Sequence, residues 1–115
     1  MLEEMPKKTR TYSSYTLEAA SLMGKLIRLG RTERKLTARD LADRAGISRG
    51  LLQRIEKGDP KCEMGAVFEV AAIVGVKLFD SDSRGLATHV ERIEDKLALL
   101  PKAVQKRRKA VDDDF

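Results

Sequence analysis

The sequence predicts an all-α protein, and two observations carry this prediction. Apolar residues recur at intervals of three and four between residues that start and stop helices. Aromatic residues make up only 4% of the chain and Trp is absent, whereas β-sandwiches depend on aromatic and β-branched side chains. With 115 residues, 42% of them hydrophobic, the chain has the size and composition of one small domain.

Positive charge is concentrated in the first half of the chain. Residues 1–61 contain 14 Lys and Arg against 8 Asp and Glu, whereas residues 62–115 contain 9 against 10. The net charge of +5 therefore belongs to the first half and suggests an anionic partner there.

The cysteine content and the apolar runs indicate a compartment. Cys62 is the single cysteine, so an intrachain disulfide is excluded, which fits a reducing environment. Residues 1–10 lack the apolar core of a signal peptide, and no apolar run has the length of a membrane span. We expect a cytoplasmic protein without contact to a membrane.

Four segments are expected along the chain. They are a flexible arm at 1–13, a helical domain at 14–80, a C-terminal helix within 81–101 and a flexible charged tail at 102–115. The acidic end of the tail, Asp112–Phe115, is expected to be solvated, with docking on a partner protein as the alternative.

The first helix of the domain should be capped by Ser14 or Thr16 and should run to about Leu29. Its apolar residues form two stripes, because they repeat with helical spacing. One stripe contains Met23, Ile27 and Gly30, and the stripe beside it contains Leu22, Leu26 and Leu29.

Two short helices should follow in close succession. Thr37 is a good N-cap, and Asp40 three residues later completes a capping box. Gly46 is expected to stop this helix in the left-handed conformation. Ser48 caps the next helix, which ends at Gly58.

Three further elements complete the predicted fold. Residues 63–74 form a helix that stops at Gly75, and residues 86–100 form the final helix. The inward face of the 63–74 helix should contain Met64, Val67, Phe68, Ala71 and Val74. Between the two helices, a short fifth element of the domain is expected at Val76, Leu78 and Phe79.

The final helix carries a narrow apolar seam of coiled-coil type, because its apolar residues alternate in steps of four and three. This seam has three interpretations: packing on its own domain through the Leu22, Leu26 and Leu29 stripe, dimerisation, or docking of a partner protein. The seam contains Leu86, Val90, Ile93, Leu97 and Leu100.

Residues 36–58 have the physical features of a helix-turn-helix motif. A tight turn at Gly46-Ile47-Ser48 joins two short helices, and Ala42 is small where these helices must cross closely. In such a motif the second helix lies in the major groove of DNA.

The region from Gly24 to Phe79 resembles the Cro/cI repressor family, also called the XRE-type helix-turn-helix family. The matching residues are Gly24, Ile27-Arg28, Leu36-Thr37, Leu41-Ala42, Ala45-Gly46-Ile47-Ser48, Ile55-Glu56, Gly58 and Gly75-Val76. The resemblance implies a lambda-repressor-like five-helix DNA-binding domain, here with an additional C-terminal helix. It also implies a homodimer on double-stranded operator DNA.

The sequence departs from this family at two places. The family often has Gln after the Leu-Thr pair, where it touches a phosphate, and here Ala38 stands in that place. The family usually has a Pro-Ser-type start to its fourth helix, and here Cys62-Glu63 provides a weaker cap.

The second half of the chain resembles the HipB-like antitoxin regulators that pair with HipA-like kinase toxins. This resemblance implies a kinase toxin as a further partner. The residues that carry it are Phe68–Ala72, Leu78-Phe79-Asp80, Leu99-Leu100-Pro101 and the basic tail that ends in Asp-Asp-Asp-Phe.

The helix capped by Ser48 supplies the residues expected to read DNA. Arg49 can bind guanine through O6 and N7, Gln53 can bind adenine through N6 and N7, and Gly50 leaves room for the groove floor. The residues expected to contact phosphates are Arg28, Thr37, Arg39, Ser48, Arg54 and Lys57. For each of them, solvation alone is the alternative.

The remaining polar residues point to no catalytic or metal chemistry. Glu56 is expected to pair with an arginine near the first helix, such as Arg28. His89 is expected on a helix surface, and Cys62 is expected as an inert packing residue. Without a phosphate loop, a nucleophile motif or a ligand cluster, we expect no metal, no cofactor and no enzymatic activity.

These observations predict a dimeric transcriptional repressor that binds inverted repeats, acting as an autoregulatory antitoxin of a HipA-like toxin. A stand-alone phage-type or metabolic repressor is the first alternative. The second is a protein-interaction module on a helix-turn-helix fold, which Ala38 favours. Ten Lys and Arg against four Asp and Glu between Lys25 and Lys57 oppose the second alternative.

Overall fold

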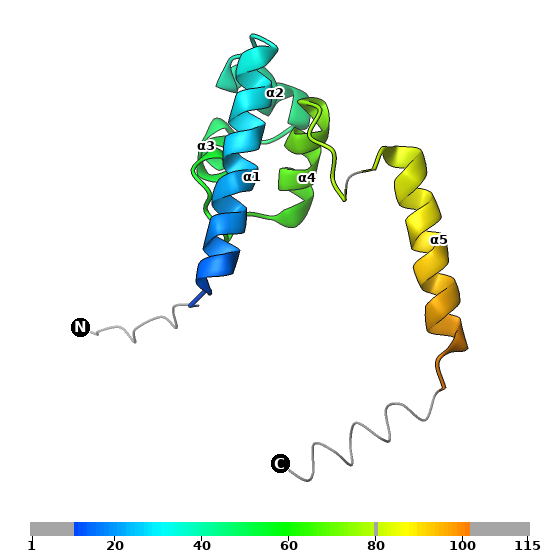
Figure 1. The fold of residues 1–115 in the computed structure, drawn as a ribbon. Coiled ribbons are helices and arrows are strands. Elements are labelled where there is room, and N and C mark those ends of the chain that lie inside the picture. Colours follow the sequence, from blue (N-terminus) through cyan, green and yellow to red (C-terminus); the bar gives the residue numbers. More distant parts are fainter. Residues whose placement is uncertain (1–10, 80, 102–115) are drawn as a thin grey trace, which may run out of the picture. The chain divides into compact units, whose positions relative to one another are not determined.

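The computed structural model describes residues 11–79 and 81–101, and this part of the chain is helical, as predicted. The chain divides into two compact units, Met1–Leu78 and Phe79–Phe115, and each unit is described by itself. The segments 1–10 and 102–115, with most of the expected arm and the expected tail, lie outside the described residues. The helices are α1 (Ser14–Glu33), α2 (Ala38–Ala45), α3 (Arg49–Glu56), α4 (Met64–Ile73) and α5 (Ser83–Leu99) (Figure 1).

Helix α1 begins earlier and ends later than predicted. Its N-cap is Ser13, not Ser14 or Thr16, because the Ser13 hydroxyl accepts a hydrogen bond from the Thr16 backbone at 3.2 Å. The helix continues past Leu29 to Glu33. Gly30 does not interrupt the helix. A Cβ at this position would lie 2.7 Å from the carbonyl oxygen of Val74. Close packing against the end of α4 is therefore the role of Gly30.

The predicted caps of α2 and α3 are confirmed. The Thr37 hydroxyl accepts from the Asp40 backbone at 3.0 Å, and the Asp40 carboxylate accepts from the Thr37 backbone at 3.1 Å. The bond from the Thr37 backbone to the carboxylate is the main cause that holds the pKa of Asp40 below its ordinary value. Gly46 ends α2 with a φ of 71°, and the Ser48 hydroxyl accepts from the Leu51 backbone at 3.0 Å. The turn between the two helices is thus specified by local interactions.

Two predictions about α4 and the following segment were wrong. Met64, the first residue of α4, is exposed and does not face the core. The segment at Val76, Leu78 and Phe79 is not helical, so the first unit has four described helices. The left-handed backbone of Gly75, with a φ of 81°, ends the helical path before this segment, and Phe79 also has a positive φ of 55°.

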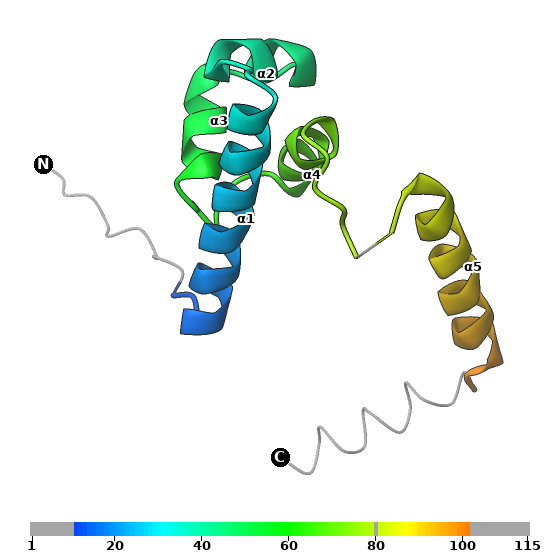
Figure 2. The ribbon, with the colours of Figure 1, turned by 45° about the horizontal axis from the view of Figure 1, so that its top comes forward.

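The core of the first unit lies where two pairs of helices cross. Helix α1 packs against α3 and α4, and α2 packs against the same two helices (Figure 2). All four helices contribute buried apolar side chains. Each helix therefore depends on the others to cover its apolar face. The buried residues are Ile27, Leu41, Ala42, Leu52, Ile55, Ala66, Val70, Ala71 and Val74.

The apolar stripe of Leu22, Leu26 and Leu29 lies on the exposed side of α1. Helix α5, in the second unit, begins after Asp82, whose carboxylate accepts from the Gly85 backbone at 2.8 Å. Leu100 has an extended backbone and follows the helix, so the helical part of the seam ends at Leu97. Because the arrangement of the two units is not determined, packing of the seam on the α1 stripe stays a prediction.

The crossing of α1 and α3 requires a glycine at position 24. A Cβ on Gly24 would lie 2.7 Å from the carbonyl oxygen of Glu56 and would also collide with that of Ile55. Both obstacles are backbone atoms in a helix, so a side chain cannot displace them without moving α3.

We therefore expect Gly24→Ala to lower the free energy of unfolding by about 1–3 kcal/mol, the usual cost of overpacking. Gly65→Ala is the matched control, because a Cβ at this exposed position in α4 meets nothing closer than a Glu63 carboxylate oxygen at 3.9 Å. That variant should be unchanged or slightly more stable. Urea unfolding followed by circular dichroism measures both, and equal stabilities would contradict the close crossing.

Candidate nucleic-acid interface

The first two turns of α3 present the predicted base-reading residues together. Ser48 caps the helix with its side chain, so Arg49 and Gly50 are the first two helical residues. Gln53 follows Arg49 by four residues and lies on the same face. Arg49, Gly50 and Gln53 are all exposed, and the opposite face of α3 buries Leu52 and Ile55. The structure therefore leaves all three residues accessible to a ligand.

Gly50 has no packing reason to be a glycine within the domain. A Cβ at this position would have only the Ser48 hydroxyl within 4 Å, at 3.9 Å, in contrast to Gly24 and Gly30. Its backbone is helical, so positive φ does not require glycine either. Glycine in a helix costs about 1 kcal/mol relative to alanine. The bare backbone at Gly50 is thus a feature that this fold does not need.

Three of the predicted phosphate-binding residues are exposed cations, one each on α1, on α2 and at the end of α3. Arg28 lies on α1, Arg39 lies on the first turn of α2, and Lys57 caps the end of α3. Among the described residues, none of the three forms an ion pair. They are available to an anion that approaches the helix-turn-helix.

Thr37 and Ser48, also predicted to contact phosphates, already act as N-caps. Each hydroxyl oxygen accepts a backbone hydrogen bond, from Asp40 and Leu51 respectively. Capping uses the oxygen as an acceptor and leaves the hydroxyl hydrogen able to donate to a phosphate oxygen. Capping and phosphate binding are therefore compatible at both residues.

Arg54 is the predicted phosphate ligand with an intrachain partner. Its Nε donates to Asp59 Oδ2 at 2.8 Å, and its side chain keeps 52% of its surface exposed. Asp59 also accepts from the Lys61 backbone at 2.9 Å. Both hydrogen bonds lower the pKa of Asp59, and the bond from the Lys61 backbone has the larger effect. Arg54 thus braces the turn after α3 and offers a phosphate only part of its guanidinium.

The prediction that Glu56 pairs with an arginine near the first helix is confirmed, but the partner is Arg31 and not the suggested Arg28. Arg31 Nε donates to Glu56 Oε2 at 2.7 Å, and its Nη2 donates to Oε1 at 2.9 Å. Arg31 Nη1 also donates to the Leu36 carbonyl at 3.1 Å. The hydrogen bond to Glu56 raises the pKa of Arg31. Arg31 therefore ties the end of α1 to the end of α3 and to the loop before α2.

Helical geometry contains the signal that distinguishes Arg31 from Arg28. Gly24, Ile27 and Gly30 define the buried face of α1. At 100° per residue, Arg31 lies about 40° from the centre of this face and Arg28 lies about 100° away. Because Arg31 forms the ion pair, Arg28 is left exposed on α1.

Two other residues singled out in the sequence have intradomain contacts. Ala38 is partly buried and packs against the hydrophobic core at the start of α2. Cys62 is partly buried beside the same core, and this burial raises the pKa of its thiol. His89 lies exposed on α5. Within the described ranges, no group of His, Cys, Asp and Glu is arranged to hold a metal ion, and no helix is long and apolar enough to cross a membrane.

Residues 22–78 match a family model described as a helix-turn-helix domain. The match covers most of α1, the whole of α2, α3 and α4, and the segment up to Leu78. No curated protein and no solved structure matches the chain. The motif, its confirmed caps and this family match agree that residues 22–78 form a helix-turn-helix domain.

The Arg31–Glu56 ion pair should contribute more to stability than the exposed Arg54–Asp59 pair. The side chains of Arg31 and Glu56 are only 16% and 10% exposed, so removing one partner leaves a poorly solvated charge. We expect Glu56→Ala to lower the free energy of unfolding by about 2 kcal/mol. Asp59→Ala should have a much smaller effect, because exposed pairs contribute little.

Arg28→Ala is the control, because the sequence suggested Arg28 as the partner of Glu56. This variant should leave the stability unchanged. Thermal or urea unfolding of the three variants checks the assignment. A loss for Arg28→Ala as large as that for Glu56→Ala would contradict the pairing of Glu56 with Arg31.

Proposed function

We propose that this protein is a sequence-specific DNA-binding transcriptional repressor, which acts by binding DNA and not by catalysis. The observation that carries the proposal is the exposed N-terminal half of α3. It brings Arg49 and Gln53 to one face beside Gly50, and the domain itself has no need of that glycine.

Helix α3 enters the major groove with its N-terminal turn first, as recognition helices do. Arg49 donates two hydrogen bonds to O6 and N7 of a guanine, and Gln53 exchanges two with N6 and N7 of an adenine. Gly50 lets the backbone of α3 approach the base edges more closely than a side chain would allow.

Phosphate contacts fix α3 in the groove but do not read sequence. The amino ends of α2 and α3 present backbone N–H groups together with the hydroxyls of Thr37 and Ser48. Arg28, Arg39 and Lys57 add exposed positive charge, and Arg54 adds part of its guanidinium. With Ala38 partly buried at the start of α2, the phosphate contact made by Gln in the Cro/cI family passes to the neighbouring Arg39.

The repressor binds an inverted repeat as a homodimer in the cytoplasm and blocks polymerase at its own promoter. One small helix-turn-helix contacts about half a site, and a dimer with twofold symmetry matches an inverted repeat. The resemblance of the second half to HipB-like antitoxins supports a HipA-like kinase toxin as a further partner.

Two other functions compete with this one. A stand-alone repressor has the same DNA interface but no toxin. A protein-interaction module on the same fold binds DNA only weakly and without sequence preference. Binding of the purified chain to a HipA-like kinase separates the antitoxin from the first alternative.

Selection from random DNA duplexes by the full-length protein tests the proposed function. We expect enrichment of an inverted repeat, which Arg49→Ala/Gln53→Ala loses while it stays folded. Arg49→Ala alone should cost about 1–3 kcal/mol at one base pair and little at the others. A protein that enriches no sequence at low salt would overturn the proposal.

The salt dependence of binding separates phosphate contacts from base contacts. The affinity for the enriched duplex should fall steeply with salt concentration, since each phosphate contact releases counterions. Lys57→Ala should flatten this dependence without changing the preferred sequence. An affinity that is independent of salt would favour the protein-interaction module.

Gly50→Ala should separate folding from DNA binding. The domain should keep its stability or gain up to about 1 kcal/mol, because the new Cβ points into open space. The affinity for the enriched duplex should fall at least about tenfold if α3 approaches the bases at this point. Gly65→Ala is the matched control, with the same open surroundings on α4. Equal DNA affinity of Gly50→Ala and the unchanged protein would contradict the proposed approach of α3.

A further inference from the structure

Among the described residues of the second unit, most of the apolar seam on α5 is left uncovered. The side chains of Val90, Ile93 and Leu97 are 56%, 54% and 61% exposed. A single helix of this length is only marginally stable in water, and it gains its stability by burying an apolar face. The seam therefore identifies α5 as a helix that requires another surface.

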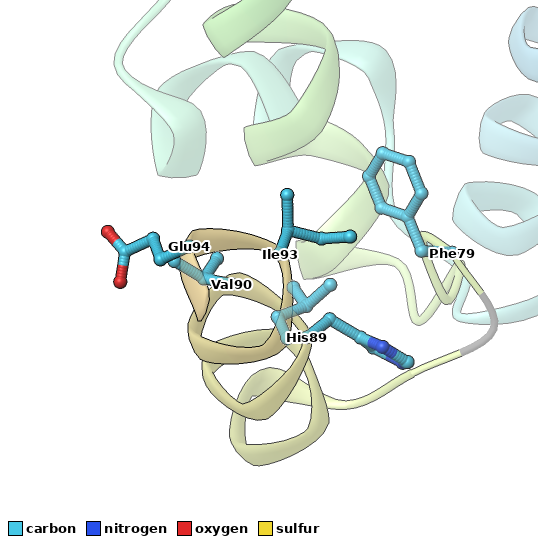
Figure 3. A pocket seen from close by; sticks show the side chains of 6 residues that line it. Phe79, His89, Val90, Ile93 and Glu94 are labelled. Carbon is cyan, nitrogen blue, oxygen red and sulfur yellow. The ribbon is translucent and has the colours of Figure 1, made fainter. Parts of the chain in front are cut away.

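The seam continues into an apolar groove at the start of the second unit. Phe79, Leu86, Val90 and Ile93 form the apolar lining, and His89 and Glu94 stand at its edges. Figure 3 shows His89 and Glu94 on opposite sides of Ile93. Phe79 is 75% exposed and has a left-handed backbone, which is unusual for a bulky residue. The groove thus combines an apolar floor with one basic and one acidic edge.

The spacing of these residues assigns each to a position of the coiled-coil heptad. Val90 and Leu97 occupy the a positions, and Leu86 and Ile93 occupy the d positions. His89 then stands at g and Glu94 at the following e, the two positions that flank the seam. In a parallel pair of helices, a g residue of one chain lies beside the next e residue of the other.

We propose that the seam of α5 binds the same seam of a second copy of this chain, as a parallel two-stranded coiled coil in register. His89 of each chain then lies beside Glu94 of the other, so an imidazole N–H can donate to a carboxylate on both sides of the pair. Val90 at a with Leu86 at d is the combination that favours two strands, whereas Leu97 at a with Ile93 at d favours more, so the choice of two strands rests on the His89–Glu94 contacts.

The charges on α5 disfavour the antiparallel arrangements that bury the same seam. In the register that pairs Leu86 with Leu97, Lys96 faces His89 and Glu94 faces Ala87. In the register that pairs Ile93 with Leu97, Glu94 faces Glu94 and Lys96 faces Lys96. Only the parallel arrangement places an acidic group beside a basic or hydrogen-donating one.

The pairing itself requires no DNA, but its consequence rests on the proposed function. Parallel α5 helices are related by a twofold axis, which is the symmetry of an inverted repeat. The seam would then be the element that joins two helix-turn-helix domains into one operator-binding protein.

Sedimentation equilibrium of the full-length protein without DNA measures the association. We expect a reversible dimer, whose dissociation constant rises at least about tenfold in Ile93→Lys because a charge enters the seam. Thr88→Lys is the matched control, because Thr88 is exposed on α5 at the f position, away from the seam. It should leave the dissociation constant unchanged, and both variants should keep the melting temperature of the helix-turn-helix domain.

Cross-linking tests the direction of pairing. In a Cys62→Ser background, Leu86→Cys should form a disulfide-linked dimer under mild oxidation, because the two cysteines are adjacent in the parallel register. In the antiparallel register Leu86 faces Leu97, and two Leu86→Cys sites lie about 16 Å apart along the axis, too far for a disulfide. Leu99→Cys, on the side away from the seam, is the control and should not cross-link.

A charge exchange tests the contact between the two chains. Glu94→Lys should weaken the dimer, because a lysine then faces His89, and adding His89→Glu should restore it. A protein that stays monomeric at all concentrations, or a dimer that Ile93→Lys does not affect, would overturn the proposal. A dimer that selects no DNA sequence would overturn the proposed function and leave the α5 pairing intact.

Discussion

The close crossing of α1 and α3 is the constraint on which the rest of the domain depends. Gly24 brings the α1 backbone against the last carbonyls of α3, and the Arg31–Glu56 pair joins the same two helices nearby. Ile27, Leu52 and Ile55 are buried between and beside them. Because α3 is fixed from behind at its C-terminal end, its first turn can stay exposed without losing its orientation.

The same arrangement explains why the candidate interface is made of helix ends. The capping box at Thr37 and the Ser48 cap satisfy backbone N–H groups by local interactions, so no other part of the chain has to cover them. The amino ends of α2 and α3 stay open to solvent and keep their partial positive charge. The domain also carries exposed cations on three elements, and open helix amino ends together with cations are what the anions of a nucleic-acid backbone require.

The caps of α2 and α3 were predictable from the sequence, whereas the cap of α1 and the contacts between helices were predicted less well. Thr37, Gly46 and Ser48 were assigned correctly because a cap depends on residues within four positions. The end of α1 was predicted at about Leu29, although the helix continues to Glu33 and its Gly30 packs closely against Val74, which follows a distant helix. Arg31 was missed for the same reason, since its partner is 25 residues away. Two left-handed residues, Gly75 and Phe79, kept the expected fifth element from forming a helix.

The central claim is that α3 reads DNA with its first turn, and amide chemical shifts measured during a titration test it most directly. The labelled full-length protein is titrated with the duplex enriched by selection. We predict the largest shift changes at residues 48–54, smaller changes at residues 37–39, and little change at the end of α4. Changes confined to α5, or none at saturating DNA, would contradict the account.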